Sequence, residues 1–158
     1  MTIRAIFYDA GHTLVRPRPE IDEVWDFLAR QLNIDIHPEQ RGEFPDVASF
    51  FYARLGEDGL GSYASDAKAR AFWSEYYVYA LRDVAHNLPR DEILSAGAAL
   101  YDWYADPAQW QPFPEVVEAL RAARDRGLVQ GVVSDWGSAL LPILHAHEIT
   151  LLMDFVVA

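Results

Sequence analysis

The 158 residues suffice for one domain, or for a small core that carries an insertion, and a hydrophobic content of 51% argues against disorder. The formal net charge of −11 argues against nucleic acid and anionic membrane surfaces as partners, because both would repel an acidic protein, so a small or metal-neutralised ligand fits better. The absence of cysteine excludes a disulfide framework, a thiolate metal site and a cysteine nucleophile.

The first predicted element is a short buried strand over residues 3–8, followed by Asp9-Ala10-Gly11-His12-Thr13-Leu14. This apolar run is too short for a signal peptide or a membrane span, so we expect a soluble cytoplasmic protein. In an open parallel sheet, ligands bind outside the carboxyl ends of the strands, which places Asp9 well for a reaction. Its position alone is equally consistent with a turn cap, because Asp is a favoured turn residue.

From about residue 20 to residue 105 the chain is predicted to form helices, with no strand among them. Helices are expected over 20–33, 45–55, 65–81 and 89–104, with Ser65 as the N-cap of the third and a glycine-rich loop over 56–61. Many aromatic residues recur at helical spacing and could line a pocket, but we interpret them as the core of a small helical bundle. They are Phe72, Trp73, Tyr76, Tyr77, Tyr79, Tyr101, Trp103 and Tyr104.

The pattern changes after Pro112-Phe113-Pro114. An amphipathic helix is predicted over 115–126 with Gly127 as its C′ residue, followed by a strand over 128–133, a helix over 139–147 and a strand over 153–157. Alternating strands and helices indicate a parallel sheet, and right-handed crossovers place the ends of the first two strands side by side. We therefore predict an α/β, Rossmann-like core over 1–16 and 106–158, interrupted by a helical insert over 17–105.

Two predicted strand ends carry polar side chains, Asp9 and Thr13 on the first and Ser134 and Asp135 on the second. A carboxylate there can act as a nucleophile on phosphorus or on activated carbon. Hydroxyl and backbone N–H groups can hold the oxygens of a phosphate group. Because a carboxylate and a phosphate repel each other, we expect Mg²⁺ between them, bound by the Asp9 carboxylate and the Gly11 carbonyl. Asp135 is expected to contact substrate or to cap the next helix, and its residue type favours the cap.

These motifs resemble those of the haloacid dehalogenase-like hydrolases. The resemblance rests on Asp9-Ala10-Gly11-His12-Thr13-Leu14, on Gly131-Val132-Val133-Ser134-Asp135, and on the helical insert between them, which is similar to that family's cap. It covers essentially the whole chain, including the run from Leu151 to Val157. It implies that Asp9 is the nucleophile, that Gly11 is a backbone metal ligand, and that Thr13 and Ser134 orient the phosphoryl group.

The chain departs from the family pattern in two places. Phosphatases of the family usually carry a second Asp, as general acid, at the position of Gly11, although dehalogenases and phosphonate-cleaving members lack it. His12 stands in place of the usual Gly; it is a candidate substrate-binding residue and proton donor, or a solvated turn residue. The family's third motif is a lysine and its fourth an acidic pair, but the single lysine here is Lys68, inside the insert.

We therefore expect the parent protein to be a hydrolase of a small phosphorylated metabolite, or of a halogenated or phosphonate substrate, and these 158 residues to be an incomplete and nearly inactive N-terminal portion. The alternative is a complete, non-catalytic binding or structural module whose sheet edge is covered by a partner or a second copy. In either case the first strand is expected to be an exposed edge that allows self-association.

Overall fold

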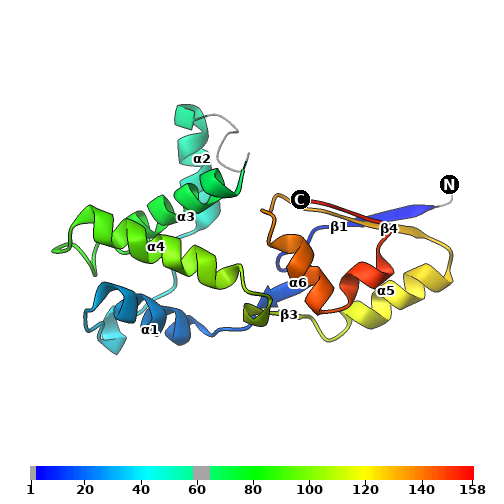
Figure 1. The fold of residues 1–158 in the computed structure, drawn as a ribbon, viewed down its shortest axis with the longest axis horizontal. Helices are drawn as coiled ribbons and strands as arrows, with labels where there is room; N and C mark the ends of the chain where they lie inside the picture. Colours follow the sequence, from blue (N-terminus) through cyan, green and yellow to red (C-terminus); the bar gives the residue numbers. More distant parts are fainter. Residues whose placement is uncertain (1–2, 59–64) are drawn as a thin grey trace. The chain divides into compact units, whose positions relative to one another are not determined.

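The computed structural model describes residues 3–58 and 65–158 and divides into two compact units (Figure 1). The core unit comprises Met1–Arg18 and Tyr104–Ala158, and the insert unit comprises Pro19–Trp103. These boundaries lie within two residues of the division predicted from the sequence. Over the part of the chain that is described, no helix combines the length and apolar character needed to cross a membrane.

The core unit contains a three-stranded parallel sheet with the order β1-β4-β5, and a separate two-stranded ribbon. Its elements are β1 (Ala5–Tyr8), β2 (Val15–Pro17), η3 (Pro107–Gln109), β3 (Trp110–Pro112), α5 (Val116–Asp125), β4 (Val129–Val133), α6 (Leu140–Ala146), η4 (Ile149–Leu152) and β5 (Phe155–Val157). The predicted α/β core with a parallel sheet is confirmed. The first two strands of the sheet are neighbours, as the crossover rule requires.

Two details of the core unit differ from the sequence prediction. The antiparallel ribbon of β2 and β3 was not predicted, because each strand has only three residues and ends in a proline, which favours a chain break. The third strand of the sheet begins at Phe155 rather than at residue 153, because the short helix η4 runs to Leu152 and Met153 and Asp154 connect it to the strand. The predicted end of α5 is confirmed, with Gly127 in the left-handed region at φ 71°.

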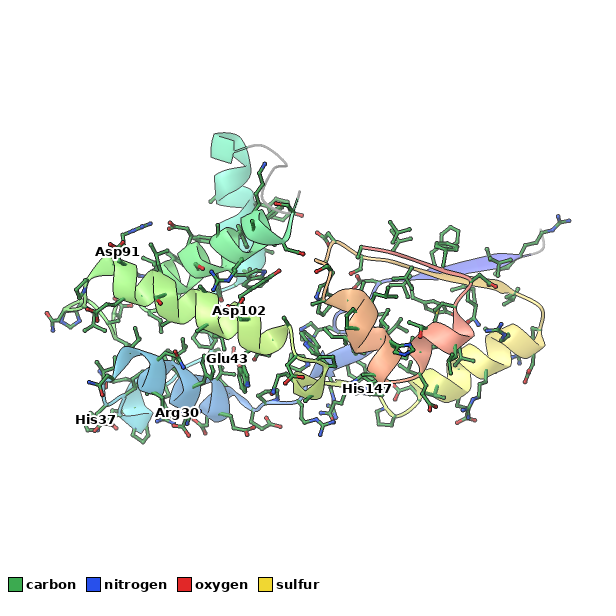
Figure 2. All side chains as sticks on the ribbon, in the orientation of Figure 1. Arg30, His37, Glu43, Asp91, Asp102 and His147 are labelled. Atoms are coloured by element: carbon green, nitrogen blue, oxygen red, sulfur yellow. The ribbon has the colours of Figure 1, made fainter. Side chains whose placement is uncertain are left out.

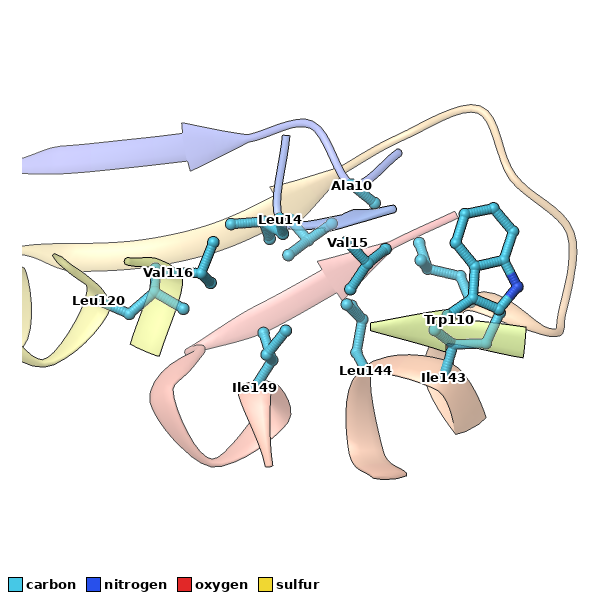
Figure 3. Packing of buried hydrophobic residues seen from close by; sticks show 11 residues of the cluster. Ala10, Leu14, Val15, Trp110, Val116, Leu120, Ile143, Leu144 and Ile149 are labelled. Atoms are coloured by element: carbon cyan, nitrogen blue, oxygen red, sulfur yellow. The ribbon is translucent and has the colours of Figure 1, made fainter. Parts of the chain in front are cut away.

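The hydrophobic core of this unit lies between the sheet and the helices that follow it (Figure 3). Its buried members include the loop residues Ala10 and Leu14, together with Val116 and Leu120 of α5 and Ile143 of α6. Because the loop after β1 contributes to this core, the backbone on both sides of Asp9 is held in place by apolar packing.

Gln130 is a fully buried polar residue of β4, the central strand of the sheet. Its side-chain oxygen accepts a hydrogen bond of 2.8 Å from the Tyr8 hydroxyl, and its side-chain nitrogen donates to the backbone oxygens of Leu120 and Leu152. Its backbone N–H donates to a carboxylate oxygen of Asp154 at 2.8 Å. One side chain therefore ties β1, α5 and η4 to the central strand, with its hydrogen-bonding capacity well used.

The apolar strands were predicted to be buried, but this is wrong for one face of the sheet. Along β1 and β5, successive side chains alternate between exposed and half-buried, and Phe7 is 63% exposed. The physical reason is that α5 and α6 lie on the same side of β1 and β4 (Figure 1), so only the side chains pointing toward these helices are covered. Among the described residues, β1 has β4 as its one neighbour and forms an edge of the sheet.

The described part of the insert unit contains helices and no strand, as predicted. Its elements are α1 (Ile21–Leu32), η1 (Pro38–Gln40), α2 (Val47–Asp58), α3 (Asp66–Ala80) and α4 (Arg90–Tyr104). The Ser65 side chain accepts a hydrogen bond from the backbone N–H of Lys68, which confirms the predicted N-cap. The predicted loop over 56–61 is wrong for residues 56–58, which belong to α2, and its remaining residues lie outside the described part of the chain.

The aromatic residues of the insert mainly form its core, in agreement with the bundle interpretation. Phe72, Tyr76 and Tyr77 are buried, and the Tyr76 hydroxyl donates a 2.5 Å hydrogen bond to the Pro45 carbonyl. Burial raises the pKa of Tyr76 to about 12. Tyr104 instead belongs to the core unit and packs against Trp110.

A charged pair joins two helices of the insert at its surface. The guanidinium of Arg70 on α3 makes two hydrogen bonds, of 2.8 and 2.7 Å, to the Asp102 carboxylate. Asp102 lies on α4 (Figure 2). These bonds lower the pKa of Asp102 and raise that of Arg70.

Replacing Gln130 by methionine should destabilise the protein by about 2–4 kcal/mol, because the buried hydrogen-bonding groups of Tyr8, Leu120 and Leu152 lose a shared partner. Urea denaturation followed by circular dichroism measures the change. The exposed Gln31→Met on α1 is the matched control and should change stability by less than about 0.5 kcal/mol. Equal stability of Gln130→Met and the wild type would show that this network does not hold the core unit together.

Candidate functional site

The candidate site lies where β1 and β4 end side by side. Tyr8, the last residue of β1, pairs with Val132 of β4. Asp9 follows Tyr8 directly, and Ser134 follows the last residue of β4. The Ser134 hydroxyl donates a hydrogen bond of 2.8 Å to Oδ1 of Asp9. Two residues that are 125 positions apart in the sequence are therefore in direct contact, as their places at adjacent strand ends predicted.

Asp9 is exposed, and both of its carboxylate oxygens accept a hydrogen bond. Oδ1 receives the Ser134 hydroxyl and Oδ2 receives the Thr13 hydroxyl at 3.4 Å, which is a long and weak bond. Two hydroxyl groups thus orient the carboxylate while leaving it accessible to solvent. This geometry suits a carboxylate that meets a ligand better than one that only caps a turn.

The loop from Asp9 to Leu14 is a compact turn built around one carbonyl group. The oxygen of Ala10 accepts hydrogen bonds from the backbone N–H groups of Thr13, Leu14 and Val15. Ala10, Leu14 and Val15 are buried, so the loop is fixed to the core while Asp9 and Thr13 point outward. Buried residues therefore anchor the turn on both sides of the exposed His12 and Thr13.

His12 occupies a left-handed backbone conformation in this turn, with φ 57°. Its N–H donates a 2.7 Å hydrogen bond to the Val15 carbonyl, which closes the turn. The position therefore favours glycine on backbone grounds, since a residue with a Cβ is strained there. The His12 side chain is exposed, and within the described residues it is the hydroxyls of Thr13 and Ser134, rather than the His12 ring, that donate hydrogen bonds to the Asp9 carboxylate.

Ser134 is held by the third strand of the sheet as well as by β1. Its N–H donates to the Val157 carbonyl at 3.1 Å, and its own carbonyl accepts from the N–H of Trp136. Asp135 is exposed and does not cap α6, because Ala139 stands at the N-cap position of that helix. The predicted capping role is therefore wrong, and substrate contact stays a prediction for Asp135.

Trp136 closes the space beside Gly11. A Cβ added to Gly11 would lie 3.0 Å from an atom of the Trp136 ring, so a side chain at position 11 requires the ring to shift. The ring also packs edge-on against Trp110, at a centroid distance of 4.7 Å. The sequence analysis missed this role of Trp136; a glycine two residues after Asp9 and a large ring two residues after Ser134 are complementary in size.

The described residues do not by themselves complete a metal site. The part of the chain that is described contains no group of three His, Cys, Asp or Glu side chains able to hold a metal ion. Mg²⁺ takes six oxygen ligands in octahedral geometry and usually keeps several waters. The carboxylate of Asp9 and the carbonyl of Gly11 are thus at most a partial ligand set, and the Mg²⁺ prediction stays untested.

Comparison with known proteins identifies the fold. The chain matches no protein-family model and no curated protein. Among solved structures, it is similar to a predicted phosphoglycolate phosphatase from Haemophilus somnus 129PT, with 18% identity over 98% of this chain and 62% of the other and a TM-score of 0.60.

Two further structures support the same conclusion. One is a hydrolase of the haloacid dehalogenase-like family from Streptococcus pneumoniae, with 18% identity over 98% of this chain and 60% of the other and a TM-score of 0.53. The other is a 2-haloacid dehalogenase from Pseudomonas syringae pv. tomato DC3000, with 20% identity over 99% of this chain and 64% of the other and a TM-score of 0.52. The chain therefore has a haloacid dehalogenase-like fold and spans less than two thirds of the length of these structures.

The left-handed conformation of His12 predicts that His12→Gly is more stable than His12→Ala by about 1 kcal/mol, because glycine relieves the strain and alanine retains it. Thermal and urea denaturation of the two variants measure the difference. Alanine being at least as stable as glycine would contradict the backbone assignment.

The contact between Gly11 and Trp136 predicts coupling between these positions. Gly11→Asp should destabilise the protein by about 1–3 kcal/mol, because the new side chain must displace a packed ring, and the loss should shrink when Trp136 is replaced by alanine.

Gly42→Asp is the matched control, since a Cβ at Gly42 meets nothing within 4 Å. It should be tolerated, and it should show no coupling to Trp136→Ala. Additive effects of Gly11→Asp and Trp136→Ala in a double-mutant cycle would show that the ring does not restrict position 11.

Proposed function

We propose that the chain, which has a haloacid dehalogenase-like fold, carries the nucleophile of a hydrolase that acts on a small phosphorylated metabolite through an aspartyl intermediate. The observation that carries the proposal is the 2.8 Å hydrogen bond from Ser134 to Asp9 across two adjacent strand ends. It fixes an exposed carboxylate at the position where parallel sheets bind ligands.

The proposed reaction has two steps at the same carboxylate. A carboxylate oxygen of Asp9 attacks phosphorus and displaces the leaving group, which takes the bonding electron pair, and an aspartyl phosphate forms. Water then attacks phosphorus, releases inorganic phosphate and restores the carboxylate. Ser134 and Thr13 orient the attacking oxygen, because each donates its hydroxyl hydrogen to one of the two carboxylate oxygens.

Mg²⁺ is part of the proposal, bound through the Asp9 carboxylate and the Gly11 carbonyl. When bound, it would offset the repulsion between the carboxylate and an anionic substrate. The described residues do not complete its ligand set, so waters or other groups would have to supply the remaining ligands.

Cleavage of a halogenated substrate is the second candidate function, and the packing of Trp136 against Gly11 favours it. Position 11 supplies no general acid to protonate a leaving group, and the Trp136 ring restricts the space for an acidic side chain there. A leaving group that departs as a stable anion without protonation is therefore preferred. A halide is such a group, and attack of Asp9 on carbon would then give an aspartyl ester. An aryl phosphate also meets this requirement, because a phenolate leaves more readily than an alkoxide.

The 158 residues alone are expected to turn over slowly. The single lysine of the sequence, Lys68, lies in the insert unit, so no lysine of the core unit can balance the charge around Asp9. The chain also spans only 60–64% of the three solved structures described above. Any longer form of the protein should therefore turn over substrate faster than the 158 residues alone.

Release of p-nitrophenolate from p-nitrophenyl phosphate, and of chloride from 2-chloropropionate, with and without Mg²⁺, tests the proposal. We expect slow, Mg²⁺-dependent phosphate ester cleavage that falls to the background rate in Asp9→Asn, because an amide is not a nucleophile. The same loss is expected in any longer form.

Asp125→Asn, an exposed carboxylate at the end of α5, makes the same chemical change away from the site and should leave the rate unaltered. Equal turnover by Asp9→Asn and the wild type would remove Asp9 from the role of nucleophile. Absence of turnover in every form of the protein would favour the non-catalytic module.

A further inference from the structure

The Trp136 ring is tied to Asp9 through both loops of the candidate site. Its six-membered ring packs against Gly11, which lies two residues after Asp9. Trp136 itself lies two residues after Ser134, whose hydroxyl is 2.8 Å from Oδ1 of Asp9. Two residues of chain span at most about 7 Å, so both loops keep the ring within reach of a small molecule bound at Asp9. These contacts join described residues and do not depend on what covers either loop.

The ring is held in a fixed orientation. It packs edge-on against Trp110, a buried member of the core (Figure 3). The indole N–H of Trp110 in turn donates a 2.7 Å hydrogen bond to the Tyr104 carbonyl. The backbone N–H of Trp136 donates to the Ser134 carbonyl at 3.0 Å, which closes a tight turn. An aromatic surface that is immobilised before a ligand arrives loses little conformational entropy on binding.

Glycine at position 11 lets the ring take the space of a side chain. A Cβ there would lie 3.0 Å from the ring, so a larger residue and the ring exclude each other. A ligand at Asp9 therefore meets aromatic carbon in addition to the hydroxyl groups of Ser134 and Thr13. Small-molecule sites commonly combine such an apolar wall with a few placed polar groups.

The two loops that form the site carry net negative charge. Residues 9–14 and 134–138 contain two aspartates and neither Lys nor Arg. Arg16, the next basic residue after the first loop, has its guanidinium over the Phe113 ring, 5.4 Å from the centroid. A second anionic group on a ligand would be repelled by the exposed carboxylate of Asp135, so an uncharged group is favoured there.

From these observations we infer that Trp136 determines the specificity of the site and selects a substrate whose reacting group carries a flat, uncharged, apolar substituent, as an aryl phosphate does. The indole ring stacks on that substituent, and aromatic pairs attract each other beyond the area that they bury. Substrates that carry a carboxylate in this place are disfavoured. The inference rests on the proposed function only in placing an anionic head group at Asp9.

Titration of the isotope-labelled 158-residue chain with phenylphosphonate and with methylphosphonate, followed by nuclear magnetic resonance with Mg²⁺ present, tests the inference. Both probes carry the same anionic head group and neither is a phosphate ester, so binding is measured without turnover. The wild type should bind phenylphosphonate roughly three- to tenfold more tightly, because its ring stacks on the indole. Phosphonoacetate, which adds a carboxylate, should bind more weakly than phenylphosphonate. The indole N–H signal that is missing in Trp136→Phe should shift with phenylphosphonate.

Trp136→Leu should remove the preference for phenylphosphonate, because leucine keeps an apolar side chain but has no flat face, whereas Trp136→Phe should retain most of it. A purely structural role of Trp136 would weaken both probes alike and leave the ratio of their dissociation constants unchanged. Leu151→Ala on η4 is the control, since this exposed leucine precedes β5 and lies toward the opposite ends of the strands from Asp9. It should leave the ratio unaltered. Circular dichroism reports whether each variant folds, and the ratio in the wild type needs no substitution.

Equal affinity of the wild type for phenylphosphonate and methylphosphonate would overturn the inference. So would a preference that survives in Trp136→Leu, or no binding of either probe. The proposed function fails separately, through absent turnover of p-nitrophenyl phosphate. A preference that depends on Trp136 in the absence of such turnover would contradict the proposed function and support the present inference.

Discussion

The parallel pairing of β1 with β4 is the constraint on which the rest of the core unit depends. The two strands are separated in sequence by the whole insert unit, yet four consecutive residue pairs join them. The entropic cost of closing a loop grows only slowly with its length, and the insert has its own buried aromatic core, so a long insertion at this point is tolerated. Pairing of these strands then brings Asp9 and Ser134 together.

Gln130 shows how this pairing is stabilised. A buried polar side chain on a central strand is costly unless its hydrogen bonds are made, and here they reach Tyr8, Leu120 and Leu152. The same strand carries Gly131, which accommodates the Phe155 ring, and it ends next to Ser134. Adjacent residues of β4 thus serve the core, the open face of the sheet and the candidate site.

Much of the fold and part of the site could be predicted from the sequence. Alternation of apolar strands with amphipathic helices indicates a parallel sheet whatever the details of packing, and Gly127 marks the end of α5 through its backbone freedom. Asp9, Thr13 and Ser134 follow predicted strands, and the structure brings all three together. Their position depends only on strand order, which short connections and handedness constrain strongly.

The features of the fold and of the site that were not predicted depend on tertiary packing, which no local sequence pattern reveals. An apolar run predicts a strand but does not show what covers each face, so the exposure of Phe7 was missed. The left-handed conformation of His12 and the contact of Trp136 with Gly11 are likewise set by how two loops meet. The short strands β2 and β3 were missed because a proline ends each of them.

Nuclear Overhauser effects in the wild-type protein test the central claim most directly, since they report proton distances without altering any residue. We predict cross-strand effects that link Phe7 with Gly131 and Tyr8 with Val132, together with effects between the side chains of Asp9 and Ser134. Effects that pair β1 with β5 instead of β4, or the absence of any between Asp9 and Ser134, would contradict the account.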